Sequence, residues 1–230
     1  MNDFDFGVII RSLPFLWQGM QYSFQLMGVA IVGGVLLGTL LALARLSSIR
    51  PLALAAGAYV NLMRSIPLVL VIFWFFFMVP LVLQWVTKAS APVAVGPAMS
   101  AYITFILFEA AYFCEIVRAG IQSVPKGQVH AARALGLSYS QSMRFVILPR
   151  AFRNVTPVLV TQVIVLFQDT SLVYVISVTD FLGAASKVAQ RDHRLVEMYL
   201  FAGSVYLVIC YCGSLLVQHL QKKNNALFAH

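Results

Sequence analysis

No charged side chain occurs between Arg11 and Arg45, and this run constrains the fold more than any other feature of the sequence. A helix needs about 20 apolar residues to cross a bilayer core about 30 Å thick. Comparable apolar runs recur along the chain, which is 60% hydrophobic and only 10% charged, against roughly 25% charged in a soluble domain. We therefore expect an all-α membrane protein with a single transmembrane domain, residues 1–230.

About five transmembrane helices are predicted from these apolar runs. They lie near Trp17–Ala44, Ser65–Val86, Pro97–Ala119, Asn154–Val178 and Met198–Gln218. Five spans place the two termini on opposite sides of the membrane. The first span also carries glycines that would allow another helix to approach closely, namely Gly28, Gly33, Gly34 and Gly38.

Basic residues indicate the orientation, because Lys and Arg are enriched on the cytoplasmic side of membrane proteins. If the C-terminus is cytoplasmic, 11 of the 16 Lys and Arg residues lie on that side: Arg45, Arg50, Arg64, Arg118, Lys126, Arg133, Arg144, Arg150, Arg153, Lys222 and Lys223. We therefore predict an external N-terminus and a cytoplasmic C-terminus. The net charge of +8 is explained by this placement, so no nucleic-acid partner is expected.

The loop after the third span, about residues 120–150, belongs to a longer stretch without Asp or Glu, from Ile116 to Gln168. Gly127–Leu135 is predicted to form a short helix, and Gly136 suits the left-handed conformation at its end. Ser138 or Ser140 would cap a second helix that runs through Leu148 and ends at Pro149.

Three interpretations of this loop compete. It could be an amphipathic connector on the membrane surface, a DNA-binding helix-turn-helix, or a docking element for a cytoplasmic protein. Its many Ala residues and few large apolar residues favour docking, and the surrounding Arg residues would steer a partner. A DNA-binding role is disfavoured because both ends of the loop are anchored in a helix bundle.

The loop resembles a motif of a known family. The motif consists of His130-Ala131-Ala132, three residues, Gly136, nine residues and then Val146-Ile147-Leu148-Pro149. This pattern is similar to the EAA loop of ABC importer permeases, although His130 replaces the usual Glu. The strings "RSIPLV" (Arg64–Val69), "EAAYFCEIVRAGIQSVPKGQ" (Glu109–Gln128) and "FQDTSLVYV" (Phe167–Val175) look like the polar amino-acid subfamily. The last string, with "RD…VEM" at Arg191–Met198, is most similar to glutamate/aspartate permeases.

The resemblance implies a type I (MetI-like) ABC importer fold with a cytoplasmic helix–Gly–helix coupling loop, in the bacterial inner membrane. It implies a transport subunit with no catalytic residue, cofactor or metal, and no phosphate loop of the form GxxxxGK[ST] is found. The implied partners are two ATP-binding cassette subunits, a second permease subunit, identical or a sister, and a periplasmic solute-binding protein. The implied ATPase-docking residues are His130, Ala131, Ala132, Gly136, Leu148 and Pro149.

Polar residues in or beside the spans are candidates for the substrate pathway, because ionised groups are costly in lipid. Glu109 and Asp169 lie within spans, Arg64 opens the second span at the inner interface, and Gln168 is a neutral donor. Structural roles compete: Asp169 could fix a helix bend by bonding Thr170 or Ser171, and Arg64 could serve only to set the orientation. Glu115 is expected to pair with Arg118, three residues on.

Two other functions stay open at this point. An ion-coupled secondary amino-acid transporter or channel would use Glu109 and Asp169 as ion or proton sites and would need no cytoplasmic partner. A membrane scaffold would not transport at all. The polar stretch Asp180–Glu197 is predicted to be external, either a solvated loop or a contact for the binding protein. The sequence does not decide between a homodimer and a pair of sister permeases, or between glutamate, aspartate and glutamine.

Overall fold

The computed structural model describes residues 4–93 and 95–226, and every regular element within these ranges is helical. The elements are α1 Phe6–Arg45, α2 Arg50–Ser65, α3 Leu68–Thr87, α4 Pro97–Gln122, α5 Lys126–Ala134, α6 Tyr139–Ser142, the π-helix η1 Met143–Ile147, α7 Leu148–Asp169, the 3-10 helix η2 Thr170–Ile176, α8 Phe181–Arg191 and α9 Leu195–Ala226.

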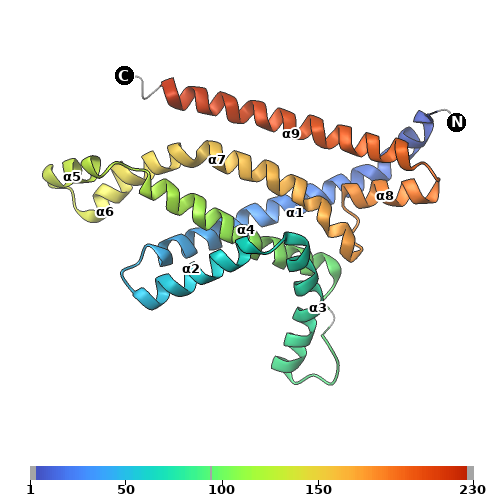
Figure 1. The fold of residues 1–230 in the computed structure, drawn as a ribbon, viewed down its shortest axis with the longest axis horizontal. Coiled ribbons are helices and arrows are strands. Elements are labelled where there is room, and N and C mark those ends of the chain that lie inside the picture. The colour runs from blue at the N-terminus through green and yellow to red at the C-terminus, as the bar shows by residue number, and fades with distance from the viewer. Residues whose placement is uncertain (1–3, 94, 227–230) are drawn as a thin grey trace.

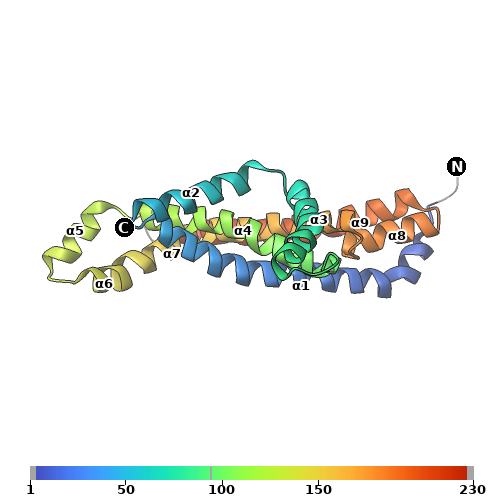
Figure 2. The same ribbon diagram turned by 90° about the horizontal axis from the view of Figure 1, so that it is seen from below.

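Five segments in the described part of the chain are long and apolar enough to cross a membrane, which confirms the predicted number of spans. They are Phe6–Arg45, Leu68–Thr87, Pro97–Gln122, Ser140–Ile176 and Leu195–Lys222. α1, α4, α7 and α9 run along the long axis of the molecule (Figures 1 and 2). α5 and α6 lie at one end of this bundle, and α8 lies at the other end near the N-terminus.

α1 and α4 form the tightest helix pair, and glycines allow their close approach. A Cβ atom on Gly38 would lie 2.8 Å from the Ala110 carbonyl oxygen and 2.9 Å from the Cys114 nitrogen. Gly33 and Gly34 likewise face α4 side chains at close range. The packing role predicted for these three glycines is confirmed. It is wrong for Gly28, because nothing lies within 4 Å of a Cβ atom there.

This difference makes a matched pair of substitutions informative. Gly38→Ala is expected to lower the stability of the folded protein by about 1–3 kcal/mol, because the added methyl group meets α4 backbone atoms that cannot rotate away. Gly28→Ala is expected to have no destabilising effect, since the methyl group enters open space and Ala favours a helix. Thermal unfolding in detergent measures both, and equal behaviour of the two variants would contradict the packing described here.

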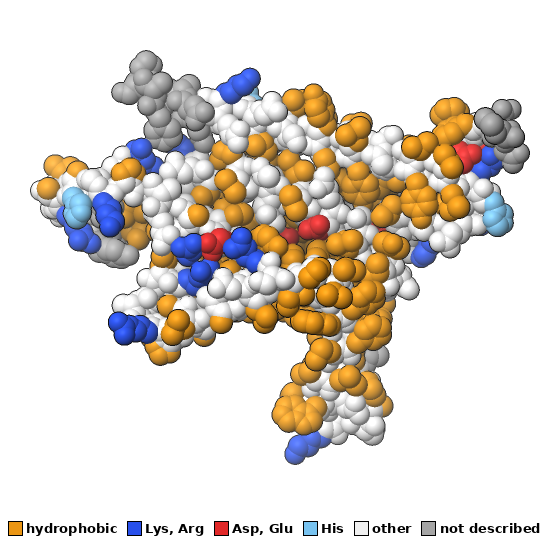
Figure 3. All heavy atoms as spheres, in the orientation of Figure 1, with side chains coloured by type: hydrophobic (Ala, Val, Ile, Leu, Met, Phe, Trp, Pro, Cys, Tyr) orange, Lys and Arg blue, Asp and Glu red, His pale blue; other side chains and the backbone are white. Residues whose placement is uncertain are grey.

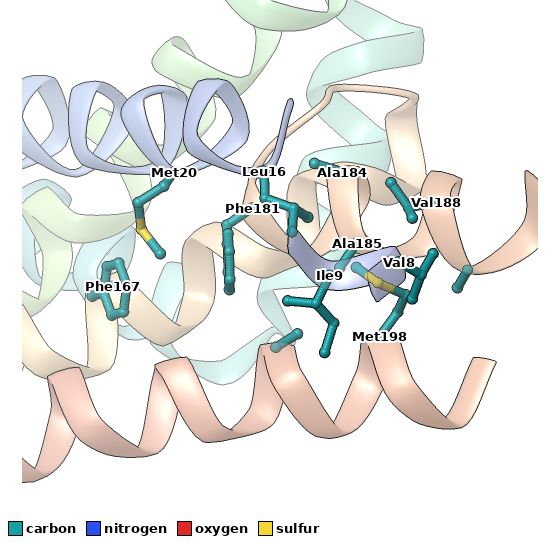
Figure 4. Packing of buried hydrophobic residues seen from close by; sticks show 12 residues of the cluster. Val8, Ile9, Leu16, Met20, Phe167, Phe181, Ala184, Ala185, Val188 and Met198 are labelled. Carbon is teal, nitrogen blue, oxygen red and sulfur yellow. The ribbon is translucent and has the colours of Figure 1, made fainter. Parts of the chain in front are cut away.

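α8 differs from the solvated loop that the sequence suggested for Asp180–Glu197. Its small and apolar residues, Gly183, Ala184, Ala185, Val188 and Ala189, are buried. They share one core with α1 and α9, where Leu16 lies near Phe181 and Met198 lies near Val8 (Figure 4). The helical spacing of these residues was the signal for a buried face, and the polar residues between them concealed it.

Asp180 begins α8 as a fully buried N-cap residue. Its carboxylate accepts hydrogen bonds from the N–H groups of Leu182 and Gly183, both at 3.0 Å. Burial raises the pKa of Asp180 to about 7, although these hydrogen bonds and the charge of Lys187 oppose the shift. The folded protein therefore holds a proton that the unfolded chain loses near the ordinary value of 3.8.

The sign of this shift predicts a pH dependence of stability. The contribution of Asp180 to the free energy of unfolding should be largest below pH 4, fall by up to about 4 kcal/mol between pH 4 and 7, and stay level above pH 7. Asp180→Asn keeps an acceptor for the helix N-terminus and should flatten this slope. Thermal unfolding in detergent at pH 5 and pH 8 compares the two proteins, and an unchanged slope in the variant would refute the assignment to Asp180.

α2 and α3 are separated by a break at residues 66–67. Pro67 has no N–H group to donate, and the residue before a proline avoids the helical conformation. Ile66 is accordingly extended, with φ −112° and ψ 135°. Beyond this break α3 leaves the bundle and crosses the direction of the other spans (Figures 1 and 2). The structure therefore places the C-terminal end of α2 beside α4, well away from the ends of the bundle.

Candidate functional site

A cavity of about 400 Å³ lies at the break between α2 and α3, close to the middle of α4. It is lined by Arg64, Ser65, Ile66, Pro67, Leu68, Phe108, Tyr112, Asp169 and Leu172. The guanidinium carbon of Arg64 lies 5.4 Å from the centroid of the Tyr112 ring, within cation–π range. Arg64 was expected at the inner interface. That expectation is wrong, because α2 runs back along α4 before it ends.

Asp169 faces the same cavity from the last residue of α7. The backbone changes there from α-helix to the 3-10 helix η2. The Thr170 hydroxyl donates to the Phe167 carbonyl at 2.7 Å, and so it does not need the Asp169 carboxylate as its acceptor. The structure thus brings two predicted pathway residues, Arg64 and Asp169, to one cavity.

Glu109 and Gln168 do not line this cavity. Glu109 is fully buried, and its Oε2 accepts a hydrogen bond from Gln162 Nε2 at 3.0 Å, while Oε1 has no partner among the described residues. Gln168 is exposed elsewhere on α7. Sequence reasoning missed Tyr112 and Gln162. Tyr112 lies three residues from Glu109 on the same helix, so its spacing was the available signal.

A second charged cluster joins α1 to α4 near the loop. Glu115 accepts a hydrogen bond from Arg118 Nε at 3.2 Å and a second bond from its terminal nitrogen, which confirms the predicted pairing. Arg45 Nη1 also contacts Glu115, at 2.5 Å, and this partner comes from α1, 70 positions earlier in the chain. The carboxylate therefore ties the two helices together at one end of the bundle.

The loop at residues 120–150 has the predicted helix–Gly–helix form. Gly136 adopts φ +80°, and its N–H donates to the Arg133 carbonyl at 2.9 Å. The Leu137 N–H donates to the Ala132 carbonyl at 3.1 Å, and these two bonds form a Schellman motif at the end of α5. Because φ is positive, a residue with a Cβ atom would strain this turn.

The second helix of the loop starts at Ser138. The Gln141 N–H donates to Ser138 Oγ at 3.3 Å, and the Ser138 N–H donates to Gln141 Oε1 at 2.8 Å. This reciprocal pair is a capping box, and it selects Ser138 over Ser140 as the cap.

Pro149 does not end this helix as the sequence suggested. The chain continues from α6 through η1 into α7, and Pro149 lies in the first turn of α7. The Leu148 N–H reaches back five residues to the Met143 carbonyl, which is the hydrogen bond of a π-helix. We attribute the continuity to this wider turn, which accommodates a residue without an N–H group. The loop is thus joined through continuous helix to the fourth span.

The exposed surface of the loop differs from the predicted Ala-rich face. His130, Ala131, Gly136 and Pro149 are exposed and Leu148 is half-buried, but Ala132 is buried within the loop. The expectation of few large exposed apolar residues is wrong, since Leu135 is 82% exposed and Phe145 is 64% exposed. Basic side chains gather over the α5–α6 end of the molecule (Figure 3). The loop therefore presents apolar side chains within a basic surface.

Comparison with known proteins identifies the family. Residues 30–225 match the model of the binding-protein-dependent transport system inner membrane component. The chain belongs to this family. It is 51% identical over 223 residues to the glutamate/aspartate import permease protein GltK of Escherichia coli O6:H1 (strain CFT073), covering 97% of this chain and 99% of the relative. It is 32% identical to the arginine transport system permease protein ArtQ of Bacillus subtilis (strain 168), covering 89% and 90%.

A solved structure agrees with this assignment. The crystal structure of an amino acid ABC transporter with histidines matches with a TM-score of 0.86 and 29% identity, covering 97% of this chain and 100% of the other. The chain is therefore a multi-pass inner-membrane permease subunit of an ABC amino-acid importer, a transport subunit with the type I fold. Neither the family nor these relatives support the ion-coupled alternative.

Proposed function

We propose that this chain forms the translocation pathway of an importer for glutamate and aspartate. The observation that carries this proposal is the identity of 51% to a glutamate/aspartate permease along nearly the whole of both chains. The N-terminus would face the periplasm and the C-terminus the cytoplasm, as the distribution of basic residues favours.

The cavity at Arg64 supports an amino-acid substrate on chemical grounds. Every amino acid carries a carboxylate and an ammonium group on one carbon atom. Arg64 offers a guanidinium group for the carboxylate, and Asp169 offers a carboxylate for the ammonium group, within one cavity. Two lining carboxylates would repel an acidic substrate, but Glu109 is bonded to Gln162 and does not line the cavity.

The cytoplasmic loop would couple this pathway to ATP hydrolysis. Two ATP-binding cassette subunits would each receive one loop in a surface cleft, with His130, Ala131, Gly136, Leu135 and Phe145 at the contact. Ala132 would shape the loop from inside, and Leu148 and Pro149 would join it to α7. ATP binding would close the ATPase pair and move both loops, and continuous helix would carry the motion to the cavity. A periplasmic binding protein would deliver the substrate to the pair of permeases.

Reconstitution tests the proposal directly. The permease, co-purified with its other subunits, is placed in proteoliposomes with the binding protein, and uptake of radiolabelled glutamate, aspartate, glutamine and arginine is measured. We expect uptake of glutamate and aspartate that requires ATP and survives collapse of the proton gradient. Preference for arginine or glutamine would refute the substrate assignment. Uptake driven by the proton gradient without ATP would refute the importer itself.

A further inference from the structure

Two guanidinium groups share the carboxylate of Glu115, and the three residues together, the Glu115 cluster, keep one positive charge in excess. Arg45 and Arg118 both pair with this one carboxylate. Their side chains are only 18% and 25% exposed, and partly buried charges are screened less than exposed ones. Glu115 is also the only acidic residue between Glu109 and Asp169 in the sequence. The cluster therefore has the charge to hold one more carboxylate.

The Glu115 cluster continues a face of α4 that begins at the cavity. Phe108 and Tyr112 line the cavity, and Glu115 and Arg118 follow at steps of three residues, on the same side of the helix. With a rise of 1.5 Å per residue, Glu115 lies about 4.5 Å and Arg118 about 9 Å beyond Tyr112 along the helix. Basic and acidic side chains gather over α2 and α4 on the face drawn in Figure 3. In the proposed orientation, a substrate that leaves the cavity for the cytoplasm passes this cluster next.

A glycine on α2 leaves one side of the cluster uncovered. A Cβ atom on Gly57 would lie 3.8 Å from Arg45 Nε, and no other described atom beyond the adjoining α2 backbone would lie within 4 Å of it. At the packed Gly38, by contrast, three atoms lie within 3 Å of the same position. A guanidinium group carries five N–H donors in a planar fork, and Arg45 contacts Glu115 through Nη1. Both space and donors are thus present for a second acceptor.

We propose that the Glu115 cluster is a second substrate site, which binds the side-chain carboxylate of glutamate or aspartate. Among the described residues that line the cavity, Arg64 is the only basic one. It can neutralise the carboxylate that all amino acids share, so the extra carboxylate of an acidic substrate needs another cation. Arg45 and Arg118 supply it one turn of α4 farther inward. Glu115 competes for the same groups, which keeps binding weak enough for release. This inference rests on the proposed function and names the groups that distinguish acidic from neutral substrates.

Equilibrium binding to the purified complex, without nucleotide or binding protein, tests the site. Labelled glutamate is displaced by unlabelled glutamate or by glutamine, which lacks the second carboxylate. Arg45→Gln is expected to weaken glutamate binding about tenfold, because a hydrogen bond to a charged group is lost, and to leave glutamine affinity unchanged. Glu115→Gln should strengthen glutamate binding about threefold or more, since the competing carboxylate is gone. Arg194→Gln breaks an ion pair at the start of α9 and should change neither affinity.

The opposite signs separate a binding site from a structural contact. An ion pair that only holds α1 against α4 would be weakened alike by Arg45→Gln and Glu115→Gln, and the affinities for both amino acids would fall together. That result, or normal glutamate binding by Arg45→Gln, would overturn the inference. Glutamate uptake by the unaltered complex would in either case still support the proposed function.

A second measurement does not depend on these charge variants. In Gly57→Cys the introduced thiol lies beside Arg45, and its labelling by a maleimide is followed by mass spectrometry of each cysteine. Glutamate at ten times its Kd should slow this labelling about tenfold, because only about a tenth of the sites stay empty, whereas glutamine should not slow it. Ala58→Cys, at the exposed neighbour on α2, should be labelled at the same rate with either amino acid. Protection of Gly57→Cys by both amino acids, or by neither, would contradict a carboxylate site at this cluster.

Discussion

Replacement of Leu135 and Phe145 together by Asp is expected to abolish ATP-driven uptake. Among the side chains of the loop that the structure describes, these are the most exposed large apolar ones, at 82% and 64%. Burial of such a side chain contributes about 1.5–3 kcal/mol, and an introduced carboxylate would have to be desolvated in the cleft of the ATPase. Both effects weaken docking, so the amount of ATPase that co-purifies with the permease should fall at least a hundredfold.

A substitution by Asp at the other end of the molecule is the control. Leu195→Asp alters a residue that is 54% exposed at the start of α9, far from the loop (Figure 1). This variant should co-purify with normal amounts of ATPase. Circular dichroism and gel filtration in detergent check that both variant proteins are folded. Normal co-purification of the Leu135 and Phe145 double variant would exclude these residues from the docking surface.

Arg64→Gln is expected to reduce glutamate uptake about ten- to a hundredfold while leaving the ATPase bound. Hydrogen bonds to charged groups contribute about 1.5–3 kcal/mol, and Gln cannot supply the guanidinium charge that would hold a substrate carboxylate. The uptake rate of Arg64→Lys should lie between those of the unaltered protein and Arg64→Gln, because Lys keeps the charge but loses the planar contact with the Tyr112 ring. Initial rates of uptake in proteoliposomes measure the effect.

Arg50→Gln is the matched control, because Arg50 begins the same helix α2 and does not line the cavity. Its uptake should match that of the unaltered protein. Asp169→Asn should also slow uptake, since it removes the group offered to the ammonium of the substrate. If Arg64→Gln transports glutamate at the normal rate, Arg64 has only a structural role, and the cavity is not the substrate pathway.

Features encoded locally were predictable from the sequence. The apolar runs gave five spans, and the structure places each near its predicted position. Gly136 was assigned the left-handed turn that its φ of +80° confirms. The loop motif pointed to the family that the comparisons show. These predictions succeed because hydrophobic length and turn chemistry act within a few residues of each other along the chain.

Two predictions that rested on the type of single residues were wrong. Pro149 was expected to end a helix, but the π-helical turn before it absorbs the missing hydrogen bond. The polar stretch around α8 was predicted to be external, either solvated or in contact with the binding protein, but most residues of that helix are small or apolar and buried. In both cases the local structure depends on the neighbouring turn or on packing partners, which the type of a single residue does not reveal.

The sequence by itself determined that this chain crosses the membrane, that it belongs with the ABC importer permeases, and which loop is the candidate for docking an ATPase. Only the tertiary structure decided which charged and polar groups from different helices meet. Arg64 and Asp169 share a cavity, Arg45 joins Glu115 and Arg118, and Glu109 is bonded to Gln162. Such pairings depend on the directions that helices take after breaks such as residues 66–67. The apolar length of each helix fixes that it can cross the membrane, but it does not fix which helix lies beside it.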